Sequence, residues 1–197
     1  MDKRILLIIL FFVHKISAQV PNNSFESWTN ENPDSWQTTN IPIVPVSILP
    51  DSDAYNGSLS VKGIVVSKNN SPFPPYLGIP GAGALGFHVS QSYDLVKGWC
   101  KLSLLPGDKF AANVRFYNIQ QETIGEGSIM IDSTTSAWTP FYMHINYFGS
   151  SAVENCSMFF TITDSTKLKS GQIGSYFLLD DLSMSRTVGI NRTSNDD

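Results

Sequence analysis

The sequence has few charged residues and no cluster of basic ones. Charged side chains make up 15% of the 197 residues, and 13 basic residues face 17 acidic ones, for a formal net charge of −4 at pH 7. The chain therefore lacks the electrostatic footprint of a protein that binds nucleic acid or an anionic membrane. Aromatic residues nonetheless reach 12% of the sequence. Such a composition predicts a folded core and not a disordered chain.

The sequence also lacks the motifs of common catalytic and metal chemistries. His88 and His144 are not in the zinc-binding pattern His-Glu-x-x-His, and no Gly-x-Ser-x-Gly nucleophile elbow is present. Glycoside hydrolysis needs two facing carboxylates about 5–9.5 Å apart. Glu126 and Asp132 bracket one expected strand and would lie about 20 Å apart at the rise of a strand. Binding without catalysis is therefore the favoured reading.

A long apolar run occurs only near the first residue. Two basic residues precede the run Ile5–Val13, and Ala18 offers a small residue for cleavage. This pattern predicts a secretory signal peptide at residues 1–18, and the run is too short to span a bilayer, which takes about 20 residues. We expect a secreted or cell-surface protein without membrane insertion. In that compartment Cys100 and Cys156 could pair, but two buried free thiols fit the sequence equally well.

Helical periodicity is missing as well, and short segments of alternating polarity separated by turn residues take its place. This pattern predicts an all-β sandwich or barrel. The segment 67–84, rich in proline and glycine, is expected to be a long surface loop. The expected strands are 43–49 at a sheet edge, 58–66, 85–89, 99–104, 109–117, 126–132, 140–148, 157–163 and 176–185.

The last expected strand carries two adjacent acids, Asp180 and Asp181, in an otherwise apolar, alternating context. Carboxylates in the middle of a strand are unfavourable unless a cation or hydrogen-bond donors compensate them. One hypothesis is a structural site at these acids. The alternative is that Asp180 faces solvent while Asp181 accepts backbone N–H groups.

Several short motifs follow one another in an order that resembles a known family. They are Asn-Ser-Phe-Glu-Ser-Trp at 23–28, Pro-Asp-Ser-Trp at 33–36, Tyr-Asn-Gly-Ser-Leu-Ser-Val at 55–61, Val-Lys-Gly-Trp-Cys-Lys at 96–101, Pro-Gly-Asp at 106–108 and the segment 174–183. The set is similar to the PCMD family, a carbohydrate metabolism domain of secreted Bacteroidetes-type proteins. The resemblance covers about Val20 to Arg186. Trp99-Cys100 departs from the two tyrosines that the family usually has.

The resemblance implies one jelly-roll β-sandwich at residues 19–186, galactose-binding-like and similar to carbohydrate-binding modules. The tail 187–197 resembles a linker to a sorting domain that is missing here. The implied function is a secreted, non-catalytic carbohydrate-binding module. Two alternatives stay open, namely a glycan-processing enzyme and a purely structural surface or adhesion module. In jelly-roll modules a structural calcium often joins the first strand to the last, and here Glu26 and Asp181 would be its ligands.

Alternation along two expected strands, 109–117 and 140–148, predicts a ligand face. The apolar set of each strand faces the core, and the other set combines aromatic rings with Arg, His and Asn. Rings can stack on the C–H faces of sugars, and planar polar groups can pair with sugar hydroxyls. If both strands share a sheet, one mostly exposed stripe results, consisting of Asn113, Arg115, Tyr117, Tyr142, His144 and Asn146.

Overall fold

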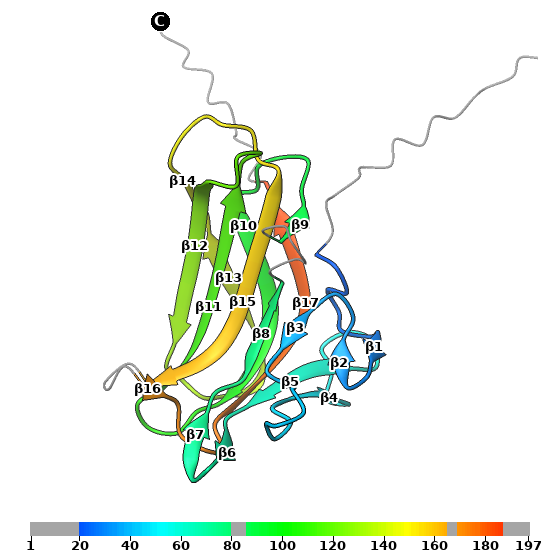
Figure 1. The fold of residues 1–197 in the computed structure, drawn as a ribbon, viewed down its shortest axis with the longest axis vertical. Coiled ribbons are helices and arrows are strands. Elements are labelled where there is room, and N and C mark those ends of the chain that lie inside the picture. The colour runs from blue at the N-terminus through cyan, green and yellow to red at the C-terminus, as the bar shows by residue number, and fades with distance from the viewer. Residues whose placement is uncertain (1–19, 80–85, 165–168, 187–197) are drawn as a thin grey trace, which may run out of the picture.

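The computed structural model describes residues 20–79, 86–164 and 169–186, which form an all-β jelly-roll sandwich (Figure 1). The predicted fold class is confirmed. The expected signal peptide and tail lie outside the described residues. Within the three described ranges, no helix is long and apolar enough to cross a membrane.

The strands, in chain order, are β1 (Trp28–Thr29), β2 (Asn32–Pro33), β3 (Gln37–Thr38), β4 (Ile48–Asp51), β5 (Ser60–Ile64), β6 (Val66–Lys68), β7 (Ser71–Phe73), β8 (Tyr76–Ile79), β9 (Phe87–His88), β10 (Leu95–Ser103), β11 (Asp108–Tyr117), β12 (Thr123–Ile131), β13 (Thr135–His144), β14 (Asn146–Tyr147), β15 (Asn155–Asp164), β16 (Lys169–Ser170) and β17 (Tyr176–Ser185).

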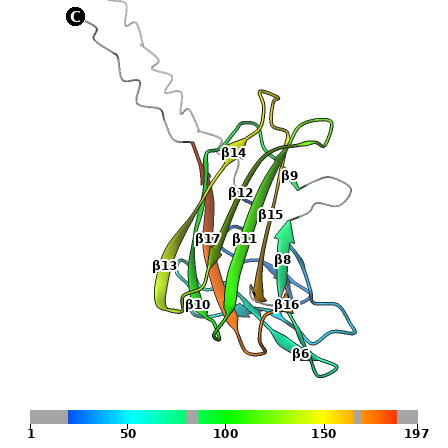
Figure 2. The same cartoon turned by 90° about the vertical axis from the view of Figure 1, so that its left-hand side faces the viewer.

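Two sheets make up the sandwich. The back sheet has five strands in the order β13-β10-β17-β5-β4. The front sheet has eight strands, of which β14-β12-β11-β15-β8-β3 form the main path while β9 and β16 also pair with β15. Figure 2 shows the two sheets as separate layers. Neighbouring strands are often far apart in the chain, as in jelly rolls generally.

The core lies between the two sheets and is centred on four phenylalanines. Phe110 and Phe160 come from the front sheet, and Phe141 and Phe177 come from the back sheet. Ring centroids in this group lie 5.3–6.3 Å apart, mostly edge to face, a favourable geometry for aromatic pairs. The alternation along β11 predicts its core side correctly, since every second residue from Phe110 to Phe116 is buried.

Both cysteines are buried free thiols, which decides between the two alternatives left open by the sequence. Cys100 lies in β10 of the back sheet, and Cys156 lies in β15 of the front sheet. Burial raises the pKa of the Cys100 thiol to about 12 and that of Cys156 well above its usual value. Because the thiolate is the reactive form, neither cysteine is suited to act as a nucleophile.

Two expectations about strands need correction. The segment 67–84 is not only a loop, because β8 lies inside the front sheet between β15 and β3. Pro75 directly precedes β8 and therefore removes no ladder N–H from it. The expected strand 140–148 is two strands, since β13 ends at His144 in the back sheet and β14 starts at Asn146 in the front sheet. Ile145 marks the crossing, with its N–H bonded to the Asp94 carbonyl.

Candidate ligand-binding surfaces

The predicted stripe is divided between the two surfaces of the sandwich. Arg115 and Tyr117 lie on β11 of the front sheet, whereas Tyr142 and His144 lie on β13 of the back sheet. Both sets point away from the core, so they face opposite directions. The prediction of one contiguous face is wrong, because alternation tells which residues share a side of a strand and not which sheet that strand joins.

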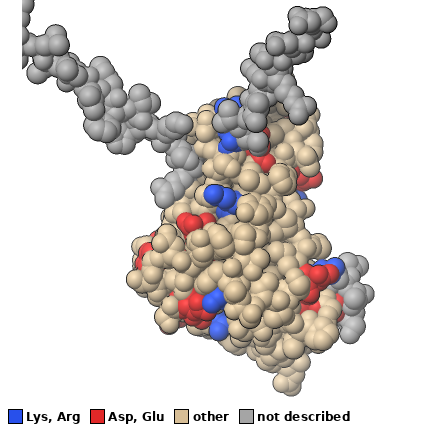
Figure 3. All heavy atoms as spheres, turned by 180° about the vertical axis from the view of Figure 1, so that it is seen from behind, with Lys and Arg blue, Asp and Glu red and all other residues tan. Residues whose placement is uncertain are grey.

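On the back surface, Tyr142 and His144 are both exposed, and 52% of Tyr142 is accessible to solvent. Figure 3 shows this side of the molecule, with few charged side chains scattered over a wide uncharged surface. Within the described part of the chain, neither residue has a side-chain hydrogen bond, ion pair or ring contact. Tyr142 and His144 therefore stand apart from the residues with which the stripe grouped them.

On the front surface, the structure brings two predicted residues, Arg115 and Asn146, into one row and adds others. Asn146 of β14 lies opposite Glu126 of β12, and Glu126 lies opposite Arg115 of β11. Ser157 of β15 continues the same row on the other side of Arg115. Among the described residues, neither the Arg115 guanidinium nor the Glu126 carboxylate has a hydrogen-bond or ion-pair partner. An amide, a carboxylate, a guanidinium and a hydroxyl thus line one row of this surface.

Aromatic rings lie beside this row, on β8 and β15. The rings of Tyr76 and Phe159 are near parallel, at 20°, with centroids 6.1 Å apart. The Tyr76 ring extends over Gly78, where a Cβ atom would stand 2.5 Å from the Tyr76 hydroxyl oxygen. Burial raises the pKa of Tyr76, and the nearby Tyr117 hydroxyl raises it further. The two tyrosines therefore approach each other across β15, and the ring of Tyr76 lies along the sheet.

Two residues of the predicted stripe are less accessible to a ligand than expected. Only 8% of Tyr117 is exposed, and its hydroxyl lies 3.1 Å from the Ser157 hydroxyl. Asn113 donates a hydrogen bond of 3.3 Å to the carbonyl of Gly127 on β12. The expectation that Tyr117 is mostly exposed is wrong, because its phenol packs over the neighbouring strand β15. Arg115 and Asn146 remain exposed as predicted.

Sequence reasoning missed Tyr76, Phe159 and Ser157. Two of the three carried a usable signal, because Phe159 and Ser157 alternate with the buried residues of the expected strand 157–163. Tyr76 had none, since it follows two prolines in the segment taken for a loop. Its place on the surface depends on the pairing of β8 with β15, a contact between residues about 80 positions apart.

The acids named for calcium hold a loop through its backbone amides. Glu26 Oε1 accepts hydrogen bonds from the N–H groups of Ser58 and Leu59, at 2.8 and 3.0 Å. Asp180, not Asp181, contacts the same loop. Its Oδ2 accepts the N–H groups of Tyr55 and Asn56, at 2.8 and 3.0 Å, and its Oδ1 accepts that of Asp181 at 2.7 Å.

Asp181 itself occupies a β-bulge of β17. Between Asp180 and Ser183, β17 has one residue more than its partner β10 has between Trp99 and Lys97. Asp181 takes a left-handed backbone conformation there, with φ of 49°. Aspartate tolerates this conformation better than most residues. At this bulge the Asp180 carboxylate binds two amides of the loop 55–59 and the amide of Asp181 itself.

Calcium needs about six to eight oxygen ligands, and this donor set is of a different kind. Amide N–H groups point at both carboxylates, and within the described ranges no three residues among His, Cys, Asp and Glu gather as a metal site. Calcium at Glu26 and Asp181 stays a prediction. If the five amides alone compensate Glu26 and Asp180, EDTA should leave the melting temperature of protein dialysed against calcium unchanged. A fall in that temperature, restored by calcium but not magnesium, would instead establish a stabilising calcium.

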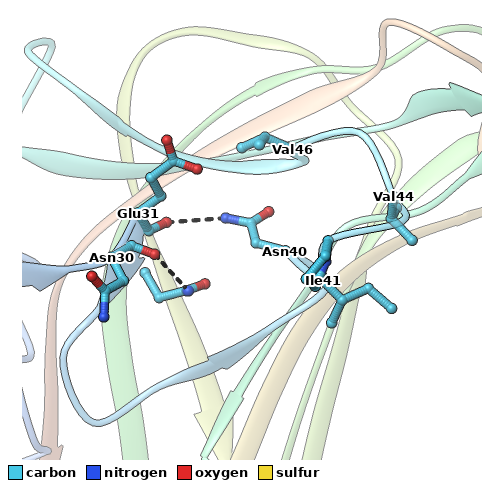
Figure 4. A pocket seen from close by; sticks show the side chains of 8 residues that line it. Asn30, Glu31, Asn40, Ile41, Val44 and Val46 are labelled. Carbon is cyan, nitrogen blue, oxygen red and sulfur yellow. Dashed lines mark hydrogen bonds between the residues drawn. The ribbon is translucent and has the colours of Figure 1, made fainter.

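A separate hollow of about 340 Å³ lies between the turn after β1 and the loop that precedes β4 (Figure 4). Asn40 lies at its wall, and both atoms of its amide are used internally. The amide nitrogen donates to the carbonyls of Glu31 and Ile48, and the oxygen accepts the N–H groups of Ser47 and Ile48. The polar groups here fix two loops to each other, and we assign no ligand to this hollow.

Comparisons with known proteins find structures of similar architecture but no family. No protein-family model matches the chain, and no curated protein matches it. Among solved structures, a protein from Bacteroides thetaiotaomicron, provisionally described as a glycoside hydrolase, superposes with a TM-score of 0.54 at 12% identity, covering 72% of this chain and 57% of its own. TmCBM61 in complex with β-1,4-galactotriose gives 0.53 at 16%, covering 84% and 96%.

A family 16 carbohydrate-binding module gives a TM-score of 0.51 at 14% identity, covering 85% of this chain and 99% of the module. The chain thus spans little more than half of the first protein but nearly the whole of each module. At these identities the likeness establishes the jelly-roll fold alone.

Proposed function

We propose that this chain is a carbohydrate-binding domain that holds a glycan on its front surface. The observation that carries the proposal is the pairing of two kinds of chemistry there. The near-parallel rings of Tyr76 and Phe159 lie on the same outward face of the sheet as Arg115 and Glu126. The charged groups of Arg115 and Glu126 have no partner among the described residues. The solved neighbours that are themselves carbohydrate-binding modules support the class of ligand.

A sugar matches both kinds of group. Its C–H face is apolar and flat enough to stack on an aromatic ring, which offers a rigid surface at little entropic cost. Its hydroxyls both donate and accept, so they pair with the donor fork of Arg115 and the acceptor oxygens of Glu126. Asn146 and Ser157, in the same row, add an amide and a hydroxyl.

Binding without turnover is the favoured form of this proposal. Among the outward positions of β8, β11, β12, β14 and β15, Glu126 is the one acidic residue. Hydrolysis with a pair of carboxylates would need a second one facing it across the sugar. The rival functions are a glycan-processing enzyme and a structural adhesion module. Secretion, a place at the cell surface and membership of the PCMD family belong to the same proposal.

The test separates the front surface from the back. A glycan array with the protein lacking residues 1–18 identifies a ligand, and calorimetry then compares Arg115→Ala with the matched control Tyr142→Ala. Both side chains are exposed on sheet surfaces, so neither change should alter stability by more than about 0.5 kcal/mol. We expect Arg115→Ala to weaken binding about tenfold or more and Tyr142→Ala to leave it unchanged.

Three results would contradict parts of the proposal. Equal affinity of wild type and Arg115→Ala would remove the front surface as the site. Turnover of the bound glycan in a hydrolase screen would replace the binding module by an enzyme. No binding on the array and no turnover in the screen would favour the adhesion module.

A further inference from the structure

The back surface carries a second aromatic group, well separated from the core. Tyr55 belongs to the loop before β5, Trp99 to β10 and Trp138 to β13. Tyr55 and Trp99 are stacked, with centroids 3.9 Å apart and planes at 13°, and Trp138 meets Tyr55 edge to face at 6.2 Å. We call these three residues the aromatic corner. It is open to solvent, since 41% of Tyr55 is exposed.

A charged network fixes the corner from the side. Both carboxylate oxygens of Asp53 accept hydrogen bonds from Lys101 Nζ, at 2.7 and 2.6 Å, and Oδ1 also accepts the Trp138 indole N–H at 3.1 Å. The Lys101 ammonium lies 5.3 Å from the centre of the Trp138 ring. Hydrogen bonding to Lys101 lowers the pKa of Asp53, so this carboxylate is ionised at neutral pH. The Trp138 ring is thereby held in one orientation.

The loop that carries Tyr55 and Asp53 is fixed from below as well. Its amides at Tyr55 and Asn56 are bound by the buried carboxylate of Asp180, next to the left-handed residue Asp181. A buried charge and a strained backbone are costly features that gather where a protein holds a ligand site rigid. The core does not need these rings, because it is filled by the phenylalanines between the sheets. Rigid, exposed rings outside the core lower the entropic cost of binding.

Beside Asp53 and Lys101 lies a hollow of about 230 Å³. It is lined also by hydroxyl residues of three strands and of the turn before β13, namely Ser103, Thr134, Thr135, Ser136 and Tyr176. The two charged residues that line it, Lys101 and Asp53, pair with each other. An anionic ligand would have to displace Asp53 from Lys101, so a neutral ligand is favoured. The hollow is smaller than the roughly 300–1,000 Å³ of pockets for drug-sized ligands, which suits a single ring.

We propose that the aromatic corner and this hollow form a second binding site, which takes one neutral sugar ring at the end of a glycan. The inference takes its ligand class from the proposed function but does not depend on the front surface. The two sites face opposite sides of the sandwich. One chain would therefore hold two glycan segments. On a dense polysaccharide, the overall avidity of the chain would then exceed the affinity of either site alone.

The four tryptophans allow each site to be observed separately. Trp99 and Trp138 lie at the corner, and the front-surface residues named above include no tryptophan. Trp28 and Trp36 donate their indole N–H groups to the carbonyls of Phe25 and Pro21. In ¹⁵N-labelled protein, titration with the methyl glycosides of galactose, glucose, mannose, xylose and arabinose should move the indole signal of Trp138 and leave those of Trp28 and Trp36 in place.

The shift should persist in Arg115→Ala, which disables the front surface, and should need about tenfold more sugar in Tyr55→Ala. The matched control is Tyr142→Ala, an exposed tyrosine of the same sheet outside the corner, and its titration should equal that of the wild type. Alanine at position 55 keeps the backbone N–H that Asp180 binds, so the loop should stay in place.

The outcomes separate the two sites. Glycan binding in calorimetry without any shift of the Trp99 or Trp138 indole signal would overturn the second site and leave the front surface intact. A Trp138 shift with calorimetric affinity unaffected by Arg115→Ala would support the corner and remove the front surface. No shift with any of the five glycosides and no binding on the array would overturn both proposed sites. The rings of the aromatic corner would then serve only to hold the loop that carries Tyr55.

Discussion

Replacing Phe110 with alanine should lower the free energy of unfolding by about 3–5 kcal/mol, the usual cost of deleting a fully buried phenylalanine. Phe110 is 0% exposed and lies at the centre of the sandwich. Its ring centroid is 5.3 Å from that of Phe177 and 6.1 Å from those of Phe141 and Phe160. The substitution therefore leaves a cavity bordered by rings of both sheets, and urea denaturation followed by circular dichroism measures the loss.

The matched control is Met130→Ala, on the neighbouring strand β12, where 67% of the side chain is exposed. That change should stay within about 0.5 kcal/mol. The free energy of unfolding could instead fall by less than about 1 kcal/mol in Phe110→Ala, with an unchanged denaturant slope. That result would contradict a central role of this ring in packing the two sheets together. A fall in the denaturant slope would show that the denatured or native state has changed in compactness. The two proteins are therefore compared in both the slope and the free energy of unfolding.

The sequence was most informative where the two faces of a strand differ in polarity. Alternation from Phe110 to Phe116 placed the core side of β11 correctly, and the last strand was predicted with the bounds that it has, Tyr176–Ser185. Both signals are local, because a half-buried strand repeats every two residues whatever its neighbours are. All-β fold class follows from the same property repeated along the chain.

The ligand surfaces depend on which strands are neighbours, and local pattern does not encode that. Tyr142 and Arg115 belong to equally regular outward sets, yet they lie on opposite surfaces because β13 joins β10 and β11 joins β15. Tyr76 reaches the front surface only through the pairing of β8 with β15. The burial of Tyr117 was missed for a related reason, since its hydroxyl packs against a side chain of the next strand.

The second large effect is expected at Asp180, the carboxylate beneath the aromatic corner. Asp180→Ala should lower the free energy of unfolding by about 3 kcal/mol, because a buried donor left without its acceptor costs about 1–3 kcal/mol and three amides lose theirs. Asp180→Asn should cost less, since asparagine keeps one acceptor oxygen for Tyr55 and Asn56 but presents an N–H₂ group toward the amide of Asp181.

The pH dependence of stability gives an independent readout of this carboxylate. Burial raises the pKa of Asp180 above its ordinary value of 3.8, although hydrogen bonds from the amides of Asn56, Asp181 and Tyr55 oppose the rise. The folded state then binds more protons than the unfolded state between the two pKa values. The contribution of Asp180 to stability must therefore fall as pH rises from about 4 through the folded pKa, and it is absent from Asp180→Asn. The difference between the two proteins across that range isolates the residue.

The same variants connect the stability of the loop to the aromatic corner. The stack of Tyr55 on Trp99 depends on the loop being held, so Asp180→Ala should alter tryptophan fluorescence and near-ultraviolet circular dichroism of the folded protein. Asp181→Asn is the matched control, because asparagine also tolerates the left-handed backbone, and the amide of Asp181 that Asp180 binds is retained. Equal stabilities of wild type and Asp180→Ala, with unchanged aromatic spectra, would mean that the loop is held by Glu26 and the Asp53–Lys101 pair alone. The buried charge would then not be what orders the second site.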